Sequence, residues 1–262
     1  MITGASSGIG KSIAEFLLQK GFVVYGTSRN PSKVLSCPFN LIELDVTDTK
    51  SITNATKTIL EKEGSIDVLI NNAGMGITGP LEETPTKEMR RVFETNFFGA
   101  IEMMKAVLPN MRAAQNGLII NITSIAGYMG LPFRGIYSAT KGALELVTEA
   151  TRMEVKQFGV TLVNIAPGDF ATNIAAGRYH TPVLDTSAYR DTYGANLDLM
   201  DSHVDAGMDP LTMAEVVYKI IQKKNPKVHY KVGTFLQKFS VVLKRILPDR
   251  LYEKLLMNHY KL

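Results

Sequence analysis

Thr3-Gly4-Ala5-Ser6-Ser7-Gly8-Ile9-Gly10 is the stretch of sequence that decides the fold. Its three glycines predict a strand-to-helix turn: the first allows the tight turn, the second lets a pyrophosphate approach the backbone, and the third allows close helix–strand packing. The helix expected next, over residues 11–20, carries its apolar residues on one stripe and stops at Gly21. Its free N–H groups and positive dipole end would face the phosphates of a nucleotide.

Strand-like and helix-like stretches alternate from this turn to about residue 170. Short runs rich in Val, Ile and Leu predict strands over residues 22–27, 40–44, 66–70, 118–122 and 160–165. Runs that are apolar on both faces suit a parallel sheet covered on both sides. Helix-length segments lie between them, the longest over residues 89–111 and 137–157. This alternation predicts βαβ units and therefore an α/β fold with a doubly wound parallel sheet.

The first strand of this sheet is unusually short in the sequence. Only Met1 and Ile2 precede the glycine-rich turn, whereas a strand is typically ~5 residues long. Either the central strand is truncated or the natural chain begins upstream, and we expect the second.

Composition narrows the class of protein. An apolar share of 45% and a charged share of 21% are those of an ordinary globular chain. The single cysteine, Cys37, excludes an intramolecular disulfide and permits a reducing compartment. No apolar run reaches the ~18 residues of a membrane span and no signal-peptide pattern opens the chain, so we expect a cytoplasmic protein. The four histidines lack metal-ligand spacing, which argues against a zinc site.

The net charge of +4 is concentrated at the carboxyl end of the chain. Residues 234–262 contain six lysines and arginines against two acids, so this tail accounts for the whole excess. The remaining body is neutral, which argues against a nucleic-acid-binding surface.

The spacing Gly-x-x-x-Gly-x-Gly, with Thr3 and Ile9 in place, resembles the short-chain dehydrogenase/reductase family. The resemblance continues in order along residues 1–172, through Asp45-Val46, Asn71-Asn72-Ala73-Gly74, Asn96, Ser124, Tyr137-x-x-x-Lys141, Pro167-Gly168 and Thr172. It implies one Rossmann-type domain over residues 1–262, with a substrate lid over about residues 173–209. It also implies homodimers or homotetramers, and an oxidoreductase that interconverts an alcohol and a carbonyl with NAD(P).

Four residues are candidates for the chemistry. Tyr137 and Lys141 are four residues apart and share one face of a helix. A phenol, with a pKa of ~10, is a poor base at neutral pH, but a neighbouring ammonium favours the phenolate, so Tyr137 can exchange a proton with the substrate oxygen. Ser124, at a strand's carboxyl end, can hydrogen-bond that oxygen. In the family's pattern, Asn96 holds a water that links Lys141 to solvent.

Cofactor preference depends on the second strand. Eighteen residues beyond Gly10, where members of the family that prefer NAD place an acid, this chain has Ser28 followed by Arg29. A small neutral residue beside a guanidinium suits a 2′-phosphate, so we expect NADP(H) to be favoured over NAD(H). The resemblance places the cofactor against Gly4, Ser6, Ser7, Gly8, Ile9, Gly10, Ser28, Arg29, Asp45, Val46, Asn72, Ala73, Gly74, Tyr137, Lys141, Pro167, Gly168, Phe170 and Thr172.

A helical extension is predicted over about residues 234–262. Apolar residues from Phe235 to Leu247 form one amphipathic stripe, Pro248 breaks the helix, and a second short helix follows. This extension resembles that of the steroid- and retinol-dehydrogenase-like branches, where it helps cover an apolar substrate. We expect it to pack over the mouth of the active site; the alternative is contact of its cationic face with an anionic membrane.

The expected substrate is therefore an apolar carbonyl or alcohol that is steroid-, retinoid- or ketone-like. Two alternatives stay open at this point. One is a 3-oxoacyl-thioester reductase on the same scaffold, against which the bulky apolar tail argues. The other is a regulator that senses NADP(H) without turnover, against which the presence of both Tyr137 and Lys141 argues.

Overall fold

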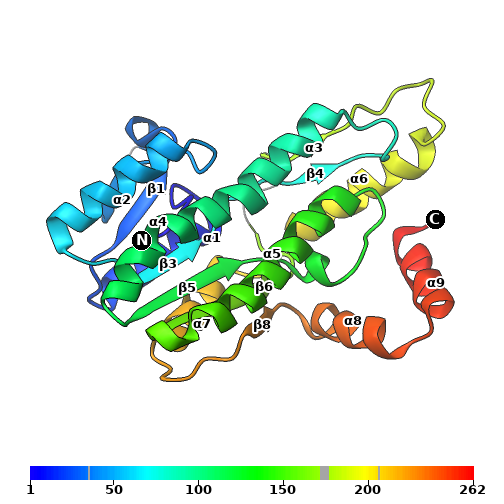
Figure 1. Ribbon diagram of the computed structural model, residues 1–262. Helices are drawn as coiled ribbons and strands as arrows, with labels where there is room; N and C mark the ends of the chain where they lie inside the picture. Colours follow the sequence, from blue (N-terminus) through cyan, green and yellow to red (C-terminus); the bar gives the residue numbers. More distant parts are fainter. Residues whose placement is uncertain (35, 172–176, 206) are drawn as a thin grey trace.

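A parallel sheet between two layers of helices forms the centre of the computed structural model, which describes residues 1–34, 36–171, 177–205 and 207–262 (Figure 1). Every strand pairs in parallel with its neighbours. The order across the sheet is β2 (Asn40–Glu43), β1 (Tyr25–Ser28), the residue Ile2, β3 (Val68–Asn71), β5 (Gly117–Ile122), β6 (Val160–Pro167) and β8 (His229–Val232). The predicted doubly wound α/β fold is confirmed.

Ile2 joins the two halves of the sheet. Its N–H donates to Tyr25 O at 2.8 Å, and its carbonyl accepts from Thr27 N at 3.0 Å. On the other side, Ile70 N donates to Met1 O at 2.9 Å, and Thr3 N donates to Ile70 O at 2.9 Å. The residues before the glycine-rich turn therefore occupy the place of a central strand, paired on both sides.

Alternate residues of the central strands pack against opposite helix layers. Ile70, Ile120 and Val163 pack on one face with α1 (Gly8–Gln19) and α7 (Pro210–Ile221). On the other face, Leu69, Ile119 and Leu162 pack with α2 (Thr49–Glu63) and α4 (Gly99–Ala113), and α5 (Gly135–Glu154) contacts β6. This two-sided burial is the reason the strands read as continuous apolar runs.

The helix predicted over residues 89–111 is interrupted. It consists of α3 (Thr86–Phe93), a π-helical turn over Glu94–Phe98, and α4. π-Turns inside α-helices occur mostly at functional sites, and this one contains Asn96.

A smaller two-stranded sheet and one helix extend beyond the carboxyl end of the main sheet. β4 (Ile77–Thr78) pairs in parallel with β7 (Tyr179–His180), and α6 (Arg190–Asp205) follows. Tyr193 of α6 donates its hydroxyl to Thr78 O at 3.0 Å, which ties α6 to this small sheet. The lid predicted over residues 173–209 includes residues outside the described ranges.

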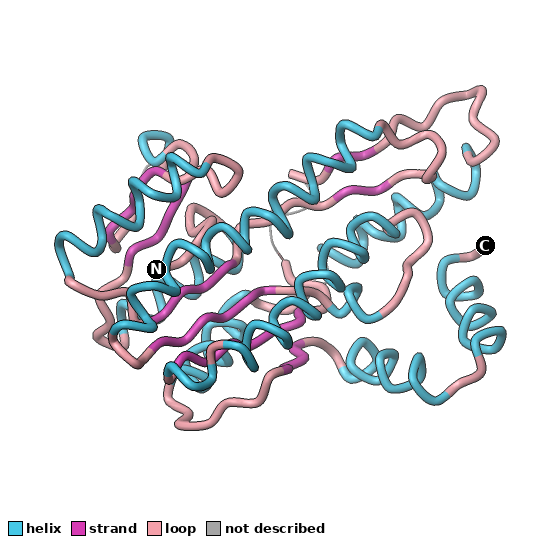
Figure 2. Tube along the Cα trace, viewed as in Figure 1, coloured by secondary structure: helices cyan, strands magenta, loops and turns pink. Residues whose placement is uncertain are grey.

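Two helices end the chain. α8 (Phe235–Ile246) begins with a capping box formed by Thr234 and Gln237, and α9 (Asp249–Tyr260) follows after Pro248, as predicted. Figure 2 shows both helices beyond the last strand, at the same end of the molecule as α6. Within the described part of the chain, no helix is long and apolar enough to span a membrane.

Candidate active site

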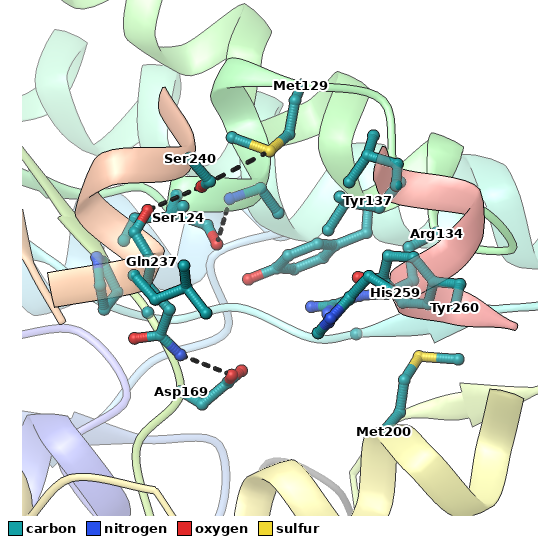
Figure 3. A pocket seen from close by; sticks show the side chains of 18 of the residues that line it. Ser124, Met129, Arg134, Tyr137, Asp169, Met200, Gln237, Ser240, His259 and Tyr260 are labelled. Carbon is teal, nitrogen blue, oxygen red and sulfur yellow. Dashed lines mark hydrogen bonds between the residues drawn. The ribbon is translucent and has the colours of Figure 1, made fainter. Parts of the chain in front are cut away.

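A cavity of about 380 Å³ lies beyond the carboxyl ends of β5 and β6. Ser124 and Tyr137 line it together with Ile9 from the glycine-rich turn and Gly168 and Phe170 from the loop after β6. Figure 3 shows the phenol of Tyr137 pointing into the cavity, on the side where Ser124 lies. Residues from four separate sequence motifs therefore meet at one site, in the crevice where open α/β sheets bind ligands.

Lys141 lies one turn after Tyr137 on the same face of α5. Its Nζ is 6.0 Å from the centroid of the Tyr137 ring and donates a 2.9 Å hydrogen bond to Ile122 O at the end of β5. Burial lowers the pKa of Lys141 below its ordinary value, while Tyr137 and the buried Glu145 oppose that shift. A lysine with one of its three protons bonded to the backbone keeps two more to donate to a ligand.

Ser124 follows β5 and begins a short 3₁₀ helix over Ile125–Tyr128. Its Oγ accepts a 3.1 Å hydrogen bond from Ala126 N, which fixes the side chain at the helix start. Because the hydroxyl is used there only as an acceptor, its own proton is available for an oxygen in the cavity.

Asn96 is fully buried in the π-turn and is held by three hydrogen bonds. Its Oδ1 accepts from Met75 N at 2.8 Å, and its Nδ2 donates to Met75 O at 2.9 Å and to Thr140 Oγ1 at 3.2 Å. Gly74 lies between Asn96 and Lys141: a methyl group added to it would come within 3.2 Å of Asn96 Oδ1 and 3.5 Å of Lys141 Nζ. The structure thus brings Asn96 to the side of the site where Lys141 lies.

The turn that opens the chain is fitted closely to the loop after β3. Gly4 has a φ of +65°, and a side chain at Gly10 would collide with the Gly4 carbonyl and the Asn72 amide. Thr3 Oγ1 accepts hydrogen bonds of 2.9 Å from both Asn72 N and Ala73 N. Asn72 Nδ2 in turn donates to Thr3 O and Gly4 O at 3.0 and 3.1 Å.

The amino end of α1 fits an anion. Ser7 is its N-cap residue but makes no side-chain cap hydrogen bond, and the first turn contains no acidic residue. The N–H groups of Gly8, Ile9 and Gly10 therefore keep their donors for a ligand, at the positive end of the helix dipole. Ser6 lies in the same turn. These features fit the diphosphate of a dinucleotide cofactor.

The residues expected to bind the adenosine part lie at the ends of β1 and β2. Ser28 ends β1 and accepts a 3.2 Å hydrogen bond from Asn30 N, and Arg29 follows with an exposed side chain. Asp45 Oδ1 accepts from the backbone and hydroxyl of Thr47, and Val46 is buried against Gly99. An exposed guanidinium beside a small hydroxyl suits a phosphate on the ribose.

The loop after β6 holds the last of the residues that the sequence predicts to bind the cofactor. Gly168 N donates to Val232 O at 2.8 Å, and Phe170 is buried and pairs with Met208. Pro167 and Gly168 both line the cavity. Thr172, predicted to contact the cofactor, lies outside the described residues.

Sequence reasoning missed polar residues that line the cavity, among them Arg134, Asp169, Gln237 and Tyr260 (Figure 3). Gln237 Nε2 donates a 2.7 Å hydrogen bond to Asp169 Oδ2, and the Arg134 guanidinium interacts electrostatically with the Tyr260 hydroxyl. Burial raises the pKa of Tyr260; the Asp169 carboxylate raises it further and Arg134 lowers it. A carboxylate directly after Pro167-Gly168 was the one sequence signal that pointed here.

Apolar side chains cover the rest of the cavity wall. They come from the segment after Ser124, from α6 and from both C-terminal helices, and include Met129, Leu131, Met200, Leu243, Leu255 and Leu256. The expected packing of the C-terminal extension over the site is therefore seen for part of its apolar residues. Among the described residues, no His, Cys, Asp and Glu side chains cluster as a metal site would require.

Comparison with known proteins places this architecture. The short chain dehydrogenase family model matches residues 1–182. The chain is 40% identical to a 3-ketodihydrosphingosine reductase of Bacteroides thetaiotaomicron, over 99% of this chain and 97% of that one. It is 31% identical to an NADPH-dependent 3-dehydrocapnine reductase of Ornithobacterium rhinotracheale, over 100% and 96%. Bovine retinol dehydrogenase 8 is also 31% identical, over 89% and 81%.

One solved structure agrees with these sequence relationships. A short-chain dehydrogenase from Streptomyces avermitilis superposes with a TM-score of 0.79 at 31% identity, covering 93% of this chain and 94% of the other. Because this superposition covers 93% of the chain, it includes residues beyond 182, where the match to the family model ends.

Proposed function

The chain belongs to the short-chain dehydrogenase/reductase family, and from that premise we propose that it reduces a long-chain 2-amino ketone with NADPH. The coarser activity, interconversion of an alcohol and a carbonyl with NAD(P), follows from membership of the family. The substrate class, the preferred cofactor and the roles of individual residues are the proposal.

The observation that carries the proposal is the composition of the cavity. The hydroxyls of Ser124 and Tyr137 lie in a cavity whose wall is largely apolar and is partly covered by the C-terminal helices. A volume of about 380 Å³ is in the range of pockets that bury most of a small ligand. A substrate with an extended alkyl chain fits this cavity, with its carbonyl beside Ser124 and Tyr137 and its chain along the apolar wall.

Tyr137 is the proposed proton donor to the carbonyl oxygen. The buried Lys141 ammonium stabilises negative charge on the phenol as the proton leaves, and its remaining N–H groups could hydrogen-bond the cofactor ribose. Ser124 donates a hydrogen bond to the same substrate oxygen, where charge develops. Asn96 orders the path by which Lys141 is re-protonated. When bound, the nicotinamide supplies the hydride.

A carboxylate on the substrate side supports an amino ketone in particular. Two of the relatives act on 3-ketodihydrosphingosine and 3-dehydrocapnine, as their names state. In 3-ketodihydrosphingosine an amine neighbours the ketone, so an enzyme that binds it needs an acceptor near its catalytic tyrosine. Asp169 lines the cavity, and its Oδ2 is shared with Gln237. The negative charge of Asp169 complements the ammonium group of an amino ketone, whereas a neutral retinoid or steroid has no such group.

NADPH is the proposed cofactor because Ser28 and Arg29 follow the pattern that suits a 2′-phosphate. An acid at position 28 would accept hydrogen bonds from the ribose hydroxyls and repel the phosphate. The exposed Arg29 can form charge-assisted hydrogen bonds to it. The 31% identical 3-dehydrocapnine reductase is NADPH-dependent by name.

A substrate panel tests the proposal. Purified protein would be given NADPH and, in turn, 3-ketodihydrosphingosine, a long-chain ketone of equal length without the amine, retinal, a 3-ketosteroid and a 3-oxoacyl thioester. We expect the amino ketone to show the highest kcat/KM, followed by the matched ketone. If the thioester or retinal shows the highest kcat/KM, the proposed substrate class is wrong and that compound's class takes its place. NADPH binding without turnover of any of them would instead support a sensor.

A further inference from the structure

The outer side of α8 is an exposed apolar stripe. Phe235, Phe239, Val242 and Ile246 follow each other at spacings of four, three and four residues, and all are exposed, Phe235 at 78% and Ile246 at 66%. The rings of Phe235 and Phe239 stack on each other, 5.6 Å apart and 13° from parallel. Side chains at this spacing lie on one face of a helix.

The opposite side of α8 attaches the helix to the protein. Val241 is buried, Gln237 is bonded to Asp169, and Ser240 lies against Met129. These contacts of the inner side hold the helix on the protein, and the apolar stripe faces away from them. An exposed apolar patch of this kind marks an interaction surface.

Exposed cations border the stripe. Lys238 and Arg245 are seven residues apart, so they lie along one edge of it, and Arg250 and Lys254 continue the positive charge on α9. Asp249 pairs with Lys244 at 3.2 Å, which leaves Glu253 as the other acid of the two helices. Apolar residues flanked by lysine and arginine are typical of helices that lie in the interface of an anionic membrane.

The cavity opens at the same surface. Leu236 and Leu255 line the cavity, yet they are 66% and 45% exposed. They therefore form part of its rim, and Leu236 continues the stripe that begins at Phe235. A molecule that leaves a lipid layer beneath α8 would enter the cavity without crossing water.

We propose that α8 and α9 bind the surface of an anionic lipid bilayer. Phe235, Phe239, Val242 and Ile246 enter the interface, and Lys238 and Arg245 contact the anionic headgroups. A second copy of this chain fits the surface less well, because two cationic faces would meet. This surface interaction goes beyond the proposed reaction, and vesicle binding measures it without any substrate.

Flotation with vesicles of phosphatidylcholine, with and without phosphatidylglycerol, tests the proposal. We expect the wild-type protein to float with the anionic vesicles and to be released from them by salt. The double variant F235S/F239S should bind about tenfold or more weakly, since two large apolar side chains are lost. K238Q/R245Q should lose affinity for the anionic vesicles alone.

The matched control is Val23→Ser, because Val23 is 66% exposed but precedes β1, at the other end of the molecule (Figure 1). It should bind vesicles as the wild type does. All variants should keep the wild-type melting temperature, NADPH affinity and turnover of a short soluble ketone, which shows that they are folded. Wild-type protein that floats with neither vesicle overturns the proposal. The proposal is also overturned if the wild type does not bind vesicles and sediments as a dimer, and if F235S/F239S sediments as a monomer, since the stripe would then be a dimer interface.

Discussion

The side-chain amide of Gln237, in the first turn of α8, donates a 2.7 Å hydrogen bond to Oδ2 of Asp169, in the loop that follows β6. The same side chain accepts a 3.0 Å hydrogen bond from Thr234 N and so completes the capping box of α8. One residue therefore links the start of the C-terminal helices to the loop that begins at Gly168. Gln237 and Asp169 both line the cavity, so this link lies in its wall.

Replacing Gln237 with leucine should loosen that wall. The substitution removes half of a capping box and one partner of a charge-assisted hydrogen bond, so we expect a loss of about 1–2 kcal/mol in unfolding free energy. KM for a long-chain ketone should rise, with kcat and the kinetics of a short ketone little changed. Denaturant unfolding and steady-state kinetics measure these effects. Gln222→Leu, at the exposed end of α7, is the control and should change neither; equal losses for long and short ketones would contradict the prediction.

Asp169→Asn separates charge from hydrogen bonding at the same place. Asparagine can still accept from Gln237, so α8 should stay in position, while the negative charge is lost. If Asp169 binds the substrate ammonium, KM for the amino ketone should rise about tenfold or more, and KM for the ketone without the amine should stay the same. The measurement is the KM of Asp169→Asn for each of the two substrates, compared with the wild-type values. A parallel rise for both would assign Asp169 a purely structural role.

Tyr137→Phe removes only the ionisable hydroxyl. The loss of a positioned acid typically costs ~10²–10⁴-fold in rate, and NADPH affinity should be nearly unchanged because the ring remains. Tyr128→Phe is the matched control: that hydroxyl lies 3.2 Å from His229 Nδ1, and Tyr128 does not line the cavity. It should keep its turnover. A near-normal kcat in Tyr137→Phe would rule out the proposed mechanism.

Lys141→Met should change how stability depends on pH. Burial lowers the pKa of Lys141 in the folded protein, so the unfolded chain binds more protons between that lowered pKa and the ordinary value of about 10.4. In this window the wild type gains stability as pH rises. The free energy of unfolding of the wild type should therefore increase relative to Lys141→Met from neutral toward alkaline pH. Lys219→Met, at a lysine 70% exposed, should show no such trend.

The fold was predictable because its strongest signals are local. The runs predicted over residues 118–122 and 160–165 match β5 and β6 closely, since central strands buried on both faces are continuously apolar. β8 was not predicted, because His229-Tyr230-Lys231-Val232 is half polar and lies at the edge of the sheet. The π-turn around Asn96 was also missed: it changes the hydrogen bonding of a helix without changing its apolar pattern.

The candidate site was predictable only on the cofactor side. Tyr137 and Lys141 are marked by their helical spacing, and the glycine-rich turn by its glycines. The substrate side is assembled from side chains far apart in the sequence, such as Arg134, Asp169 and Tyr260, whose meeting depends on the path of α8 and α9. The amphipathic stripe of α8 was visible in the sequence, but which of its residues face the cavity and which face outward required the structure.

Arg29→Ala tests the cofactor preference. Arg29 follows β1 with an exposed side chain, next to Ser28, whose hydroxyl already accepts from Asn30 N. If Arg29 binds the 2′-phosphate, its loss removes one partner of a charge-assisted hydrogen bond, on the order of 1.5–3 kcal/mol, or roughly tenfold to hundredfold in affinity. Exposure to solvent favours the lower end of that range.

NADH, which has no 2′-phosphate, should bind almost as before, and Ser28→Asp should shift the preference further toward NADH by repelling the phosphate. Fluorescence titration of the reduced nicotinamide measures both affinities without any substrate, and Lys33→Ala, another exposed cation in the same loop, is the control. Wild-type protein that binds NADH as tightly as NADPH would reduce Arg29 to a solvated loop residue.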